Sequence, residues 1–233
     1  MPVRANRSAN LSAPLAPRMT ATYTPPQTPL HYLHQDEFIL VLDKPAGLLS
    51  VPGRGEDKAD SLVTRVQAEF ADALIVHRLD RDTSGLLVLA RGADMHRKLS
   101  MAFAAREVEK RYVARVAGEL KDATGEINLP IIVDWENRPK QHVNHATGKP
   151  SVTRYRLLSF DAITNSSLVE LEPVTGRTHQ LRVHLAALGH PMWGDTLYGD
   201  ASLANRLLLH ACRLGLTHPH TGEAMHWHSP PAF

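Results

Sequence analysis

Residues 77–90 read His77-Arg78-Leu79-Asp80-Arg81-Asp82-Thr83-Ser84-Gly85-Leu86-Leu87-Val88-Leu89-Ala90. The first six residues hold two arginines and two aspartates, and an unbroken apolar run follows. That run predicts a strand over 84–90 that is central in its sheet. A charged turn at the end of a buried strand is a common place for catalytic groups, because the scaffold holds them rigidly.

The chain has 233 residues, of which 43% are hydrophobic and 21% charged, as in ordinary soluble globular proteins. This length can form one large domain or two small ones, and either can bury a core. No apolar run is long enough to span a membrane, so we expect no transmembrane helix and no membrane partner. The single cysteine, Cys212, excludes an internal disulfide and a cysteine-rich zinc site, and it fits a reducing cytoplasmic location.

The formal net charge is only +2. Residues 1–29 contribute Arg4, Arg7 and Arg18 and no acidic residue, so the remainder is close to neutral. Overall charge therefore does not indicate nucleic-acid binding, and any basic surface must be local. Residues 1–29 are rich in Pro, Ala, Ser and Thr without hydrophobic periodicity and lack the apolar core of a secretory signal. They predict a disordered leader, or translation from Met19, ahead of one folded domain over 30–233.

From Leu30 onward, short apolar runs separated by turn residues predict many strands and few helices. Apolar residues at four-residue spacing predict helices over 61–70, with Ser61 as N-cap, over 94–106, with Asp94 as cap, and over 178–188. Strands and helices do not alternate regularly, and no repeat is present. We therefore predict an α+β fold with a mixed, mostly antiparallel sheet. The expected strands cover 38–42, 84–90, 110–116, 126–133, 151–160, 167–173 and 207–217.

Two further segments accompany the first: Lys110-Arg111-Tyr112, and Thr175-Gly176-Arg177-Thr178-His179-Gln180-Leu181-Arg182-Val183-His184. In this order, the three resemble the H-R-L-D-x-x-[ST]-[ST]-G, K-x-Y and T-G-R-x-H-Q-[IL]-R-x-H motifs of the RluA-type RNA pseudouridine synthases. The resemblance extends over about 30–233. It implies the pseudouridine synthase fold, a bent mixed sheet with a central catalytic cleft and flanking helices.

The resemblance also implies roles for single residues. Asp80 matches the catalytic aspartate, and Arg182 matches the arginine that pairs with it. Tyr112 matches a tyrosine that packs against the target base and is a candidate for moving a proton at C5. Arg78 matches an arginine that inserts into the RNA where the target base has left the stack. The physical chemistry fits, because a guanidinium keeps a nearby carboxylate ionised in a dry cleft, and a stacked base must be extruded before an enzyme reaches it.

Each of these residues also has a structural explanation. Asp80 could cap amides of its own turn, although Asp82 is the natural candidate for that task. Arg78 could form an ion pair with Asp80, and Tyr112 could be an ordinary core aromatic. Arg182 could be a surface arginine, and the helical pattern places it at the edge of the core.

Two other segments carry weaker indications. Lys44-Pro45-Ala46-Gly47-Leu48 resembles the family's K-P-x-G-L element, and we interpret Gly47 as a scaffold turn that shapes the cleft. Residues 134–141, Asp134-Trp135-Glu136-Asn137-Arg138-Pro139-Lys140-Gln141, resemble a segment of the family's branch with dual RNA specificity. A solvated charged hairpin is the alternative. The candidates for phosphate contacts are Arg138 and Lys140, with Lys149, Arg154 and Arg156 nearby.

Fourteen histidines raise the question of a metal site. His179 and His184 are five residues apart, about 140° around a helix, which is a poor arrangement for one metal ion. The pairs at 218/220 and 226/228 could each face one way on a strand. However, no carboxylate falls at a ligand spacing and no H-E-x-x-H is present, so we expect no metal site.

The family's reaction breaks the bond between N1 of uracil and C1′ of ribose, turns the base and rejoins it through C5. It has no redox step and no net hydrolysis, so no cofactor is expected. A carboxylate could act as a nucleophile or base on the ribose, or attack the base ring, and the sequence leaves these routes open.

We predict a stand-alone, monomeric isomerase that converts uridine to pseudouridine in structured RNA. The resemblance to the dual-specificity branch implies two targets, uridine 746 of 23S rRNA and uridine 32 of the tRNA anticodon stem-loop. One alternative is the same chemistry at another uridine. Alternatives of other classes are a non-catalytic RNA-binding protein and a metal-dependent hydrolase that uses the histidines.

Overall fold

The computed structural model describes residues 22–233. The expected leader therefore lies outside the described residues as far as residue 21. Residues 22–29 have no regular secondary structure, but Tyr23 is buried. Its hydroxyl donates to the Asp60 carbonyl at 3.1 Å and accepts a hydrogen bond from the Leu49 amide at 3.0 Å. This contact ties the segment before Leu30 to two loops of the domain.

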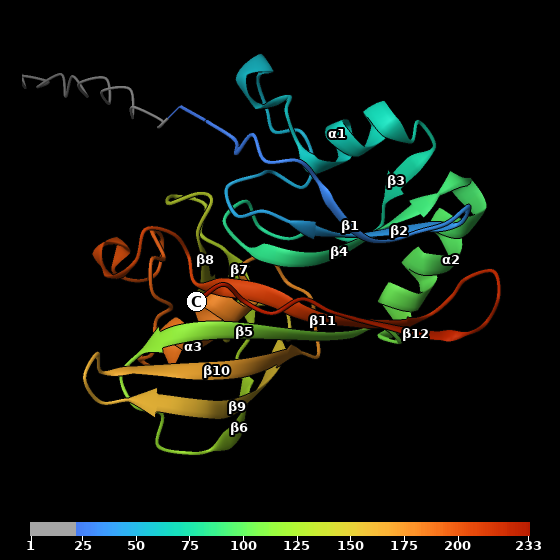
Figure 1. Cartoon of the computed structure of the whole chain (residues 1–233). Coiled ribbons are helices and arrows are strands. Elements are labelled where there is room, and N and C mark those ends of the chain that lie inside the picture. Colours follow the sequence, from blue (N-terminus) through green and yellow to red (C-terminus); the bar gives the residue numbers. More distant parts are fainter. Residues whose placement is uncertain (1–21) are drawn as a thin grey trace, which may run out of the picture.

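One long sheet forms the framework of the described chain, in the order β1-β2-β4-β11-β5-β10-β9-β6, with β3 beside β4 and β12 beside β11 (Figure 1). Within residues 22–233, all of its neighbouring strands are antiparallel except the pair β4–β11. The predicted α+β class with a mixed, mostly antiparallel sheet is confirmed. The strands are β1 (His31–Gln35), β2 (Ile39–Lys44), β3 (Ala73–Ile75), β4 (Ser84–Arg91), β5 (Glu109–Ala117), β6 (Thr124–Asn128), β9 (Val152–Asp161), β10 (Ser166–Pro173), β11 (Leu209–Thr217) and β12 (Ala224–His228).

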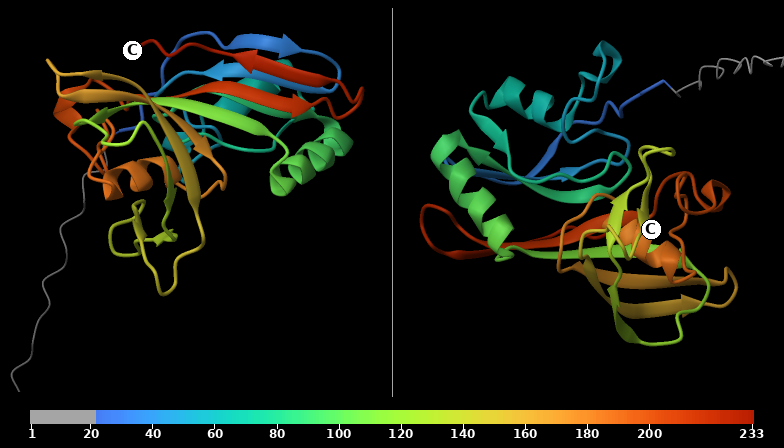
Figure 2. Two further views of the ribbon diagram at one scale, coloured as in Figure 1. Left: turned by 90° about the horizontal axis from the view of Figure 1, so that it is seen from below. Right: turned by 180° about the vertical axis from the view of Figure 1, so that it is seen from behind.

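The strand expected over 126–133 is divided in the structure. Its first part belongs to β6, and its second part is β7 (Ile131–Val133), which pairs with β8 (Gln141–Val143) in a separate hairpin. Pro130 lies at the break, because it has no amide hydrogen to continue the ladder. The β7–β8 hairpin projects from the long sheet on the same side as helix α3 (Gln180–Ala187) (Figure 2). The strand prediction missed the three-residue strands β3 and β8, and it missed β1 and β12, whose histidines obscure an apolar alternation.

The helices of the described chain are α1 (Leu62–Glu69), α2 (Gly92–Ala105) and α3, with 3-10 turns at Glu56–Lys58 and Ala201–Leu203. Helix α1 begins after the predicted N-cap Ser61, whose hydroxyl accepts a hydrogen bond from the Thr64 amide at 3.3 Å. Helix α2 begins earlier than predicted. Asp94 lies in its first turn and pairs with Arg97 and Lys98, at 2.9 and 3.1 Å, instead of capping it.

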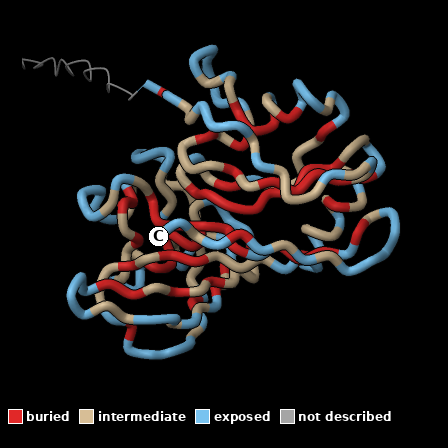
Figure 3. Tube along the Cα trace, in the orientation of Figure 1, coloured by how far each residue is buried: buried red, intermediate tan, exposed pale blue. Residues whose placement is uncertain are grey.

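The strands β2 and β4 are covered on both faces. Their side chains alternate, so that one set packs with α1 and the other packs with α2. A third core lies between α3 and the β5–β10 half of the sheet. Figure 3 shows the buried residues concentrated along the strands, and residues 84–90 are buried throughout, as predicted for a central strand. The α1-side core includes Leu40, Leu42, Leu87 and Leu89. The α2-side core includes Ile39, Val41, Leu86 and Val88. The α3-side core includes Ala114, Val116, Val169 and Leu171.

The charged turn enters β4 where that strand lies parallel to β11. Gly85 has a φ of +112°, and any side chain there would collide with the backbone of Ala211, so only glycine fits. Next to Asp80 in the turn, Leu79 is buried, and its carbonyl accepts a hydrogen bond from the Ser50 hydroxyl at 2.7 Å. The backbone on both sides of Asp80 is therefore fixed.

Lys44, at the end of β2, is fully buried and contacts the same turn through the Arg81 carbonyl. Its ammonium group donates to the carbonyls of Pro45 at 2.9 Å, Leu48 at 2.7 Å and Arg81 at 2.9 Å. The Gly47 amide donates to the same Arg81 carbonyl at 2.9 Å. Burial lowers the pKa of Lys44 to about 7. The turn predicted at Gly47 thus supports the charged turn, and the clamp by Lys44 was not anticipated.

Candidate active site

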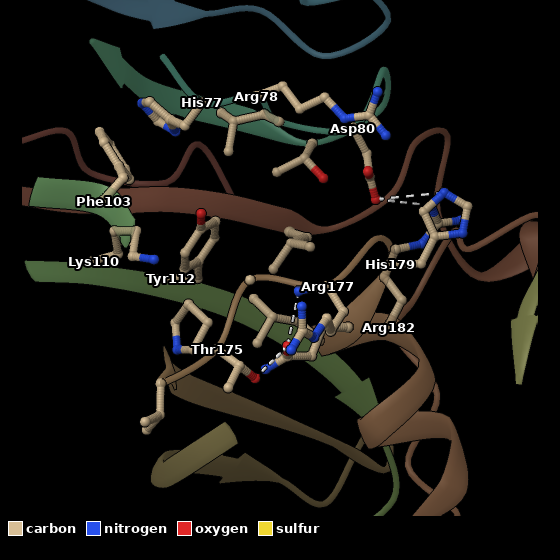
Figure 4. Close-up of a pocket in the computed structure, with 18 of the residues that line it drawn as sticks. His77, Arg78, Asp80, Phe103, Lys110, Tyr112, Thr175, Arg177, His179 and Arg182 are labelled. Carbon is tan, nitrogen blue, oxygen red and sulfur yellow. Dashed lines mark hydrogen bonds and ion pairs between the residues drawn. The ribbon is translucent and has the colours of Figure 1, made fainter. Parts of the chain in front are cut away.

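A cavity of about 620 Å³ opens where three segments of the chain meet (Figure 4). The turn at 77–83 forms one wall and β5 forms another through Lys110 and Tyr112. The chain from Pro173 to Arg182 forms the third. An adjoining hollow of about 470 Å³ has the turn, the loop at 49–51 and Pro139 in its lining. The two spaces share Arg78, Leu79, Asp80, His179 and Arg182.

Asp80 and Arg182 are 102 residues apart and form an ion pair at the edge of this cavity. Nη1 of Arg182 donates to Oδ2 of Asp80 at 3.3 Å, and Nε2 of His179 lies 3.8 Å from the same oxygen. Figure 4 shows the Asp80 carboxylate pointing toward both partners. Among the described residues, no backbone amide donates to this carboxylate, so Asp80 is not a cap of its own turn.

Asp82 does not act as the expected backbone cap either. Its two oxygens accept hydrogen bonds from Nε and Nη2 of Arg81 at 2.8 and 2.9 Å. A main-chain bond from the Thr83 amide to the Asp80 carbonyl, at 3.2 Å, closes the turn. Arg78 forms no ion pair with Asp80 in the described chain; it is exposed and lines both spaces. The structure therefore does not contain the alternative Arg78–Asp80 pair.

Arg182 is fixed by an aspartate that the sequence analysis missed. Nε and Nη2 of Arg182 donate to the two oxygens of Asp195 at 2.8 and 2.7 Å, and Asp195 is completely buried. The amides of Leu197 and Tyr198 also donate to Asp195, at 2.9 and 3.1 Å. Burial alone would raise the pKa of Asp195, but the hydrogen bonds and charge of Arg182 outweigh burial and lower it. One edge of the guanidinium is thereby occupied, and Nη1 is left for Asp80.

Arg182 lies deeper than the predicted edge of the core, with only 4% of its surface exposed. Helix α3 is buried on nearly all sides from Gln180 to Leu185, because β8, β9 and β10 all contact it. Polar partners satisfy its buried side chains: His184 contacts Thr153 Oγ1 at 2.9 Å and the Leu129 carbonyl at 3.0 Å. The apolar spacing predicted this helix, but it could not show that Arg182 is buried, since the polar residues of the helix are buried too.

Tyr112 projects from β5 into the same cavity, and its ring also packs against the α1-side and α3-side cores. Figure 4 shows the ring rising toward the turn that carries Asp80. Burial, and then the nearby charge of Asp80, raises the pKa of the Tyr112 hydroxyl well above its usual value. The hydroxyl is therefore a neutral hydrogen-bond donor near neutral pH.

His77 supports the turn from the other end of the cavity. Its Nε2 accepts a hydrogen bond from the Val88 amide at 3.1 Å, and its ring stacks on Phe103 with 4.5 Å between centroids. Burial lowers the pKa of His77 to about 3, so the ring is neutral in the folded protein. His77 therefore has a structural role: it holds the start of the turn against β4 and Phe103.

The lining of the main cavity carries an excess of positive charge. Its cations other than Arg182 form no salt bridge within residues 22–233, whereas its one carboxylate, Asp80, is paired. Burial also lowers the pKa of Lys110, which has no anionic partner to offset it. Of the unpaired cations, only Arg78 was predicted. Lys110 and Arg177 were not, although they belong to the motifs that identified Tyr112 and Arg182. The unpaired cations are Arg78, Arg106, Lys110 and Arg177.

The arginines expected to extend a phosphate-binding surface are occupied elsewhere. On β9, Arg154 pairs with Glu126 at 3.1 Å and Arg156 pairs with Glu170 at 3.0 Å. Neither lines the cavity. The strand places both side chains opposite acidic residues of neighbouring strands, a pairing that depends on sheet register and was invisible in the sequence.

Arg138 and Lys140 lie between β7 and β8, outside the main cavity. Pro139, between them, lines the adjoining hollow. A chain of contacts continues from this hairpin to Asp80. The Gln141 amide donates to the Tyr198 hydroxyl at 2.7 Å, and that hydroxyl is 2.8 Å from Nδ1 of His179.

The histidines do not gather into a metal centre. Among residues 22–233, no three His, Cys, Asp or Glu side chains converge as a metal ion would require. His34 and His218 instead share the carboxylate of Asp36, at 2.7 and 3.1 Å. No helix in this part of the chain is long and apolar enough to cross a membrane.

Comparison with known proteins agrees with the motifs and the fold. The family model for RNA pseudouridylate synthase matches residues 38–187. The dual-specificity RNA pseudouridine synthase RluA of Escherichia coli (strain K12) is 49% identical over 215 residues, which cover 91% of this chain and 98% of that protein. RluA of Salmonella typhi is 51% identical with the same coverage.

Solved structures show the same architecture. Human RNA Pseudouridylate Synthase Domain Containing 1 superposes with a TM-score of 0.74 at 30% identity, covering 90% of this chain and 87% of that one. Human RNA Pseudouridylate Synthase Domain Containing 4 gives a TM-score of 0.69 at 28% identity, with coverages of 86% and 88%. The chain therefore belongs to the RluA-type family of RNA pseudouridine synthases, isomerases that act on RNA.

Proposed function

We propose that this pseudouridine synthase modifies uridine 746 of 23S rRNA and uridine 32 of the tRNA anticodon stem-loop, with Asp80 as its catalytic carboxylate. The choice of targets is supported by relatives that are named dual-specificity enzymes and share about half of their residues over nearly their whole length. The alternative is the same reaction at another uridine. We further propose that the enzyme acts as a cytoplasmic monomer.

The assignment of Asp80 rests on one observation: it is the acidic side chain of the cavity lining, and it is paired with Arg182 at 3.3 Å. In the reaction, uracil leaves C1′ through N1 and returns through C5; C5 loses its proton, and N1 gains one, either the same proton or one from solvent. Nothing is added or lost overall. Whether Asp80 attacks C1′, removes a ribose proton or attacks the ring, its carboxylate must point at the nucleotide, and the hydrogen bond from Nη1 of Arg182 holds it at the cavity.

Tyr112 and Arg78 are proposed to handle the extruded nucleotide. The ring of Tyr112 lines the cavity, where its flat face can stack on a uracil, and its neutral hydroxyl can take part in proton exchange at C5. Arg78 is exposed at the junction of the two spaces. A planar guanidinium there can occupy the gap that the extruded base leaves in the RNA.

The charge of the cleft supports an RNA substrate more directly than the charge of the whole chain. Arg106, Lys110 and Arg177 line the cavity without a salt-bridge partner in the described part of the chain. Phosphate groups are the natural partners of such cations, since binding releases condensed counterions from the RNA. Arg138 and Lys140 are proposed to add contacts at the adjoining hollow, which Pro139 lines.

Two RNAs test this proposal: a 23S rRNA hairpin containing uridine 746 and an anticodon stem-loop, each tritiated at C5 of uridine. We expect tritium release from both, with pseudouridine mapped to the two named positions. Release from neither RNA, together with modification of a different uridine in total RNA, would refute the proposed targets, while the proposed isomerase activity would stand.

A non-catalytic RNA-binding protein would bind these RNAs and release no tritium from any RNA pool. A metal-dependent hydrolase would lose its activity when a chelator is added. We expect the rate of tritium release to be unchanged by chelation.

A further inference from the structure

The turn between β7 and β8 presents a large aromatic surface to solvent. Trp135 is 68% exposed, although it is one of only three tryptophans in the chain. The turn that carries it is well built. The amide and the side-chain nitrogen of Asn137 donate to the two oxygens of Asp134 at 3.1 and 2.9 Å. The Asp134 amide also donates to the Lys140 carbonyl at 2.9 Å, so the indole is held out on a fixed turn.

Arg138 covers one face of this indole. Its Cζ lies 3.5 Å from the ring centroid, a close cation–π stack. Since Trp135 is nevertheless mostly exposed, the opposite face of the ring is open. An open aromatic face backed by a guanidinium matches the chemistry of a nucleobase, because bases stack on aromatic rings and arginine reaches the neighbouring phosphate.

The position of the turn also favours RNA over a protein partner. Pro139 lines the hollow that has Asp80, Arg78 and Arg182 in its wall. Gln141, which follows Lys140, donates a hydrogen bond to the Tyr198 hydroxyl. That hydroxyl contacts His179, which lies beside Asp80. Figure 2 shows the hairpin standing on the side of the sheet that carries α3. The turn that carries the indole therefore borders the hollow that adjoins the catalytic cavity.

We propose that Trp135 stacks an unpaired base of the substrate RNA on its open face while Arg138 contacts the adjacent phosphate. This site rests on the proposed RNA substrate and lies outside the catalytic cavity. It would explain why the turn holds an exposed tryptophan in a fixed position: the platform is preorganised, so little side-chain entropy is lost when the base arrives.

Binding of the anticodon stem-loop to Trp135→Ala, Trp135→Phe and a matched control, Ile163→Ala, tests the proposal. Ile163 is 97% exposed between β9 and β10, away from both spaces. All variants carry Asp80→Asn so that the RNA is not converted. We expect Trp135→Ala to weaken binding about ten-fold, Trp135→Phe to stay within about three-fold, and Ile163→Ala to match the parent.

Two readouts separate stacking from charge. The slope of log K against log salt should be unchanged in Trp135→Ala. In Arg138→Gln it should be smaller by about 1, as expected for the loss of one phosphate contact. Tryptophan fluorescence should be quenched when RNA binds, and most of this quenching should vanish in Trp135→Phe. Parental affinity in Trp135→Ala, or equal quenching in Trp135→Phe, would overturn the proposal and leave the indole to a protein partner.

Failure of the proposed function would look different. In that case the enzyme with Asp80 intact would release no tritium from the stem-loop, whichever residue occupied position 135.

Discussion

Arginines on β9 and arginines in the cleft show how one residue type serves two purposes. Arg154 and Arg156 are each 57% exposed and lie within about 3 Å of a glutamate. Exposed pairs of this kind contribute only about 0–1 kcal/mol, so they chiefly neutralise the sheet surface. Arg106 and Arg177 line the cavity and have no such partner within the described residues. The comparison teaches that local pairing, and not the net charge of +2, locates the surface available to RNA.

The largest effect on stability is expected where a buried pair is broken. Asp195→Asn removes a fully buried charge that holds two nitrogens of Arg182. We expect a loss of about 3 kcal/mol in the free energy of unfolding, measured by urea denaturation. In the folded variant, kcat should fall roughly 100-fold because Arg182 is no longer aimed at Asp80.

The matched control is Glu126→Gln, which removes the acidic partner of an exposed arginine on β9. It should change stability by less than about 0.5 kcal/mol and leave kcat unchanged. Equal effects of the two substitutions would mean that burial does not distinguish the two regions.

A smaller effect is expected from the unpaired cations of the cleft. Lys110→Gln and Arg177→Gln should each weaken RNA affinity on the order of ten-fold at 0.1 M salt. Each should also reduce the slope of log K against log salt by about 1, whereas Arg156→Gln should leave the slope unchanged. If Arg156→Gln lowered the slope as much as the cleft variants did, the β9 face would be part of the RNA surface.

Lys44 offers a third case, a cation that is fully buried and whose partners within residues 22–233 are all carbonyls. Its pKa in the folded protein, about 7, lies below the ordinary value of 10.5. Between these values the unfolded chain binds more protons, so this lysine makes the free energy of unfolding rise with pH, by up to about 1.4 kcal/mol per unit. The rise should be absent in Lys44→Met. Parallel pH curves for the two proteins would contradict a lowered pKa at Lys44.

Much of the fold was predictable because apolar runs and turn residues act locally. The central strand at 84–90 and the Ser61 cap follow from neighbouring residues alone. The predictions of one strand over 126–133 and of a helix that begins at Asp94 were wrong in detail, because strand pairing and tertiary packing decide where an element begins and ends. The partners of Arg154 and Arg156 depend on strand register, which no local pattern specifies.

The site divides in the same way. Asp80, Tyr112 and Arg182 were found through motifs, and the structure brings all three to one cavity. Asp195 was missed because an aspartate between Gly194 and Thr196 resembles an ordinary turn residue. Lys44 was missed because a lysine is expected at the surface, and only the carbonyls converging from two loops reveal that it is buried.

The central claim is that the Asp80 carboxylate, held by Arg182, performs the chemistry in this cavity. Single-turnover tritium release and RNA affinity, measured together for the wild type and Asp80→Asn on the same stem-loop, test it most directly. We predict that the variant binds RNA within a few-fold of the wild type and releases tritium at least roughly 1,000-fold more slowly. Release at the wild-type rate by Asp80→Asn would contradict the claim.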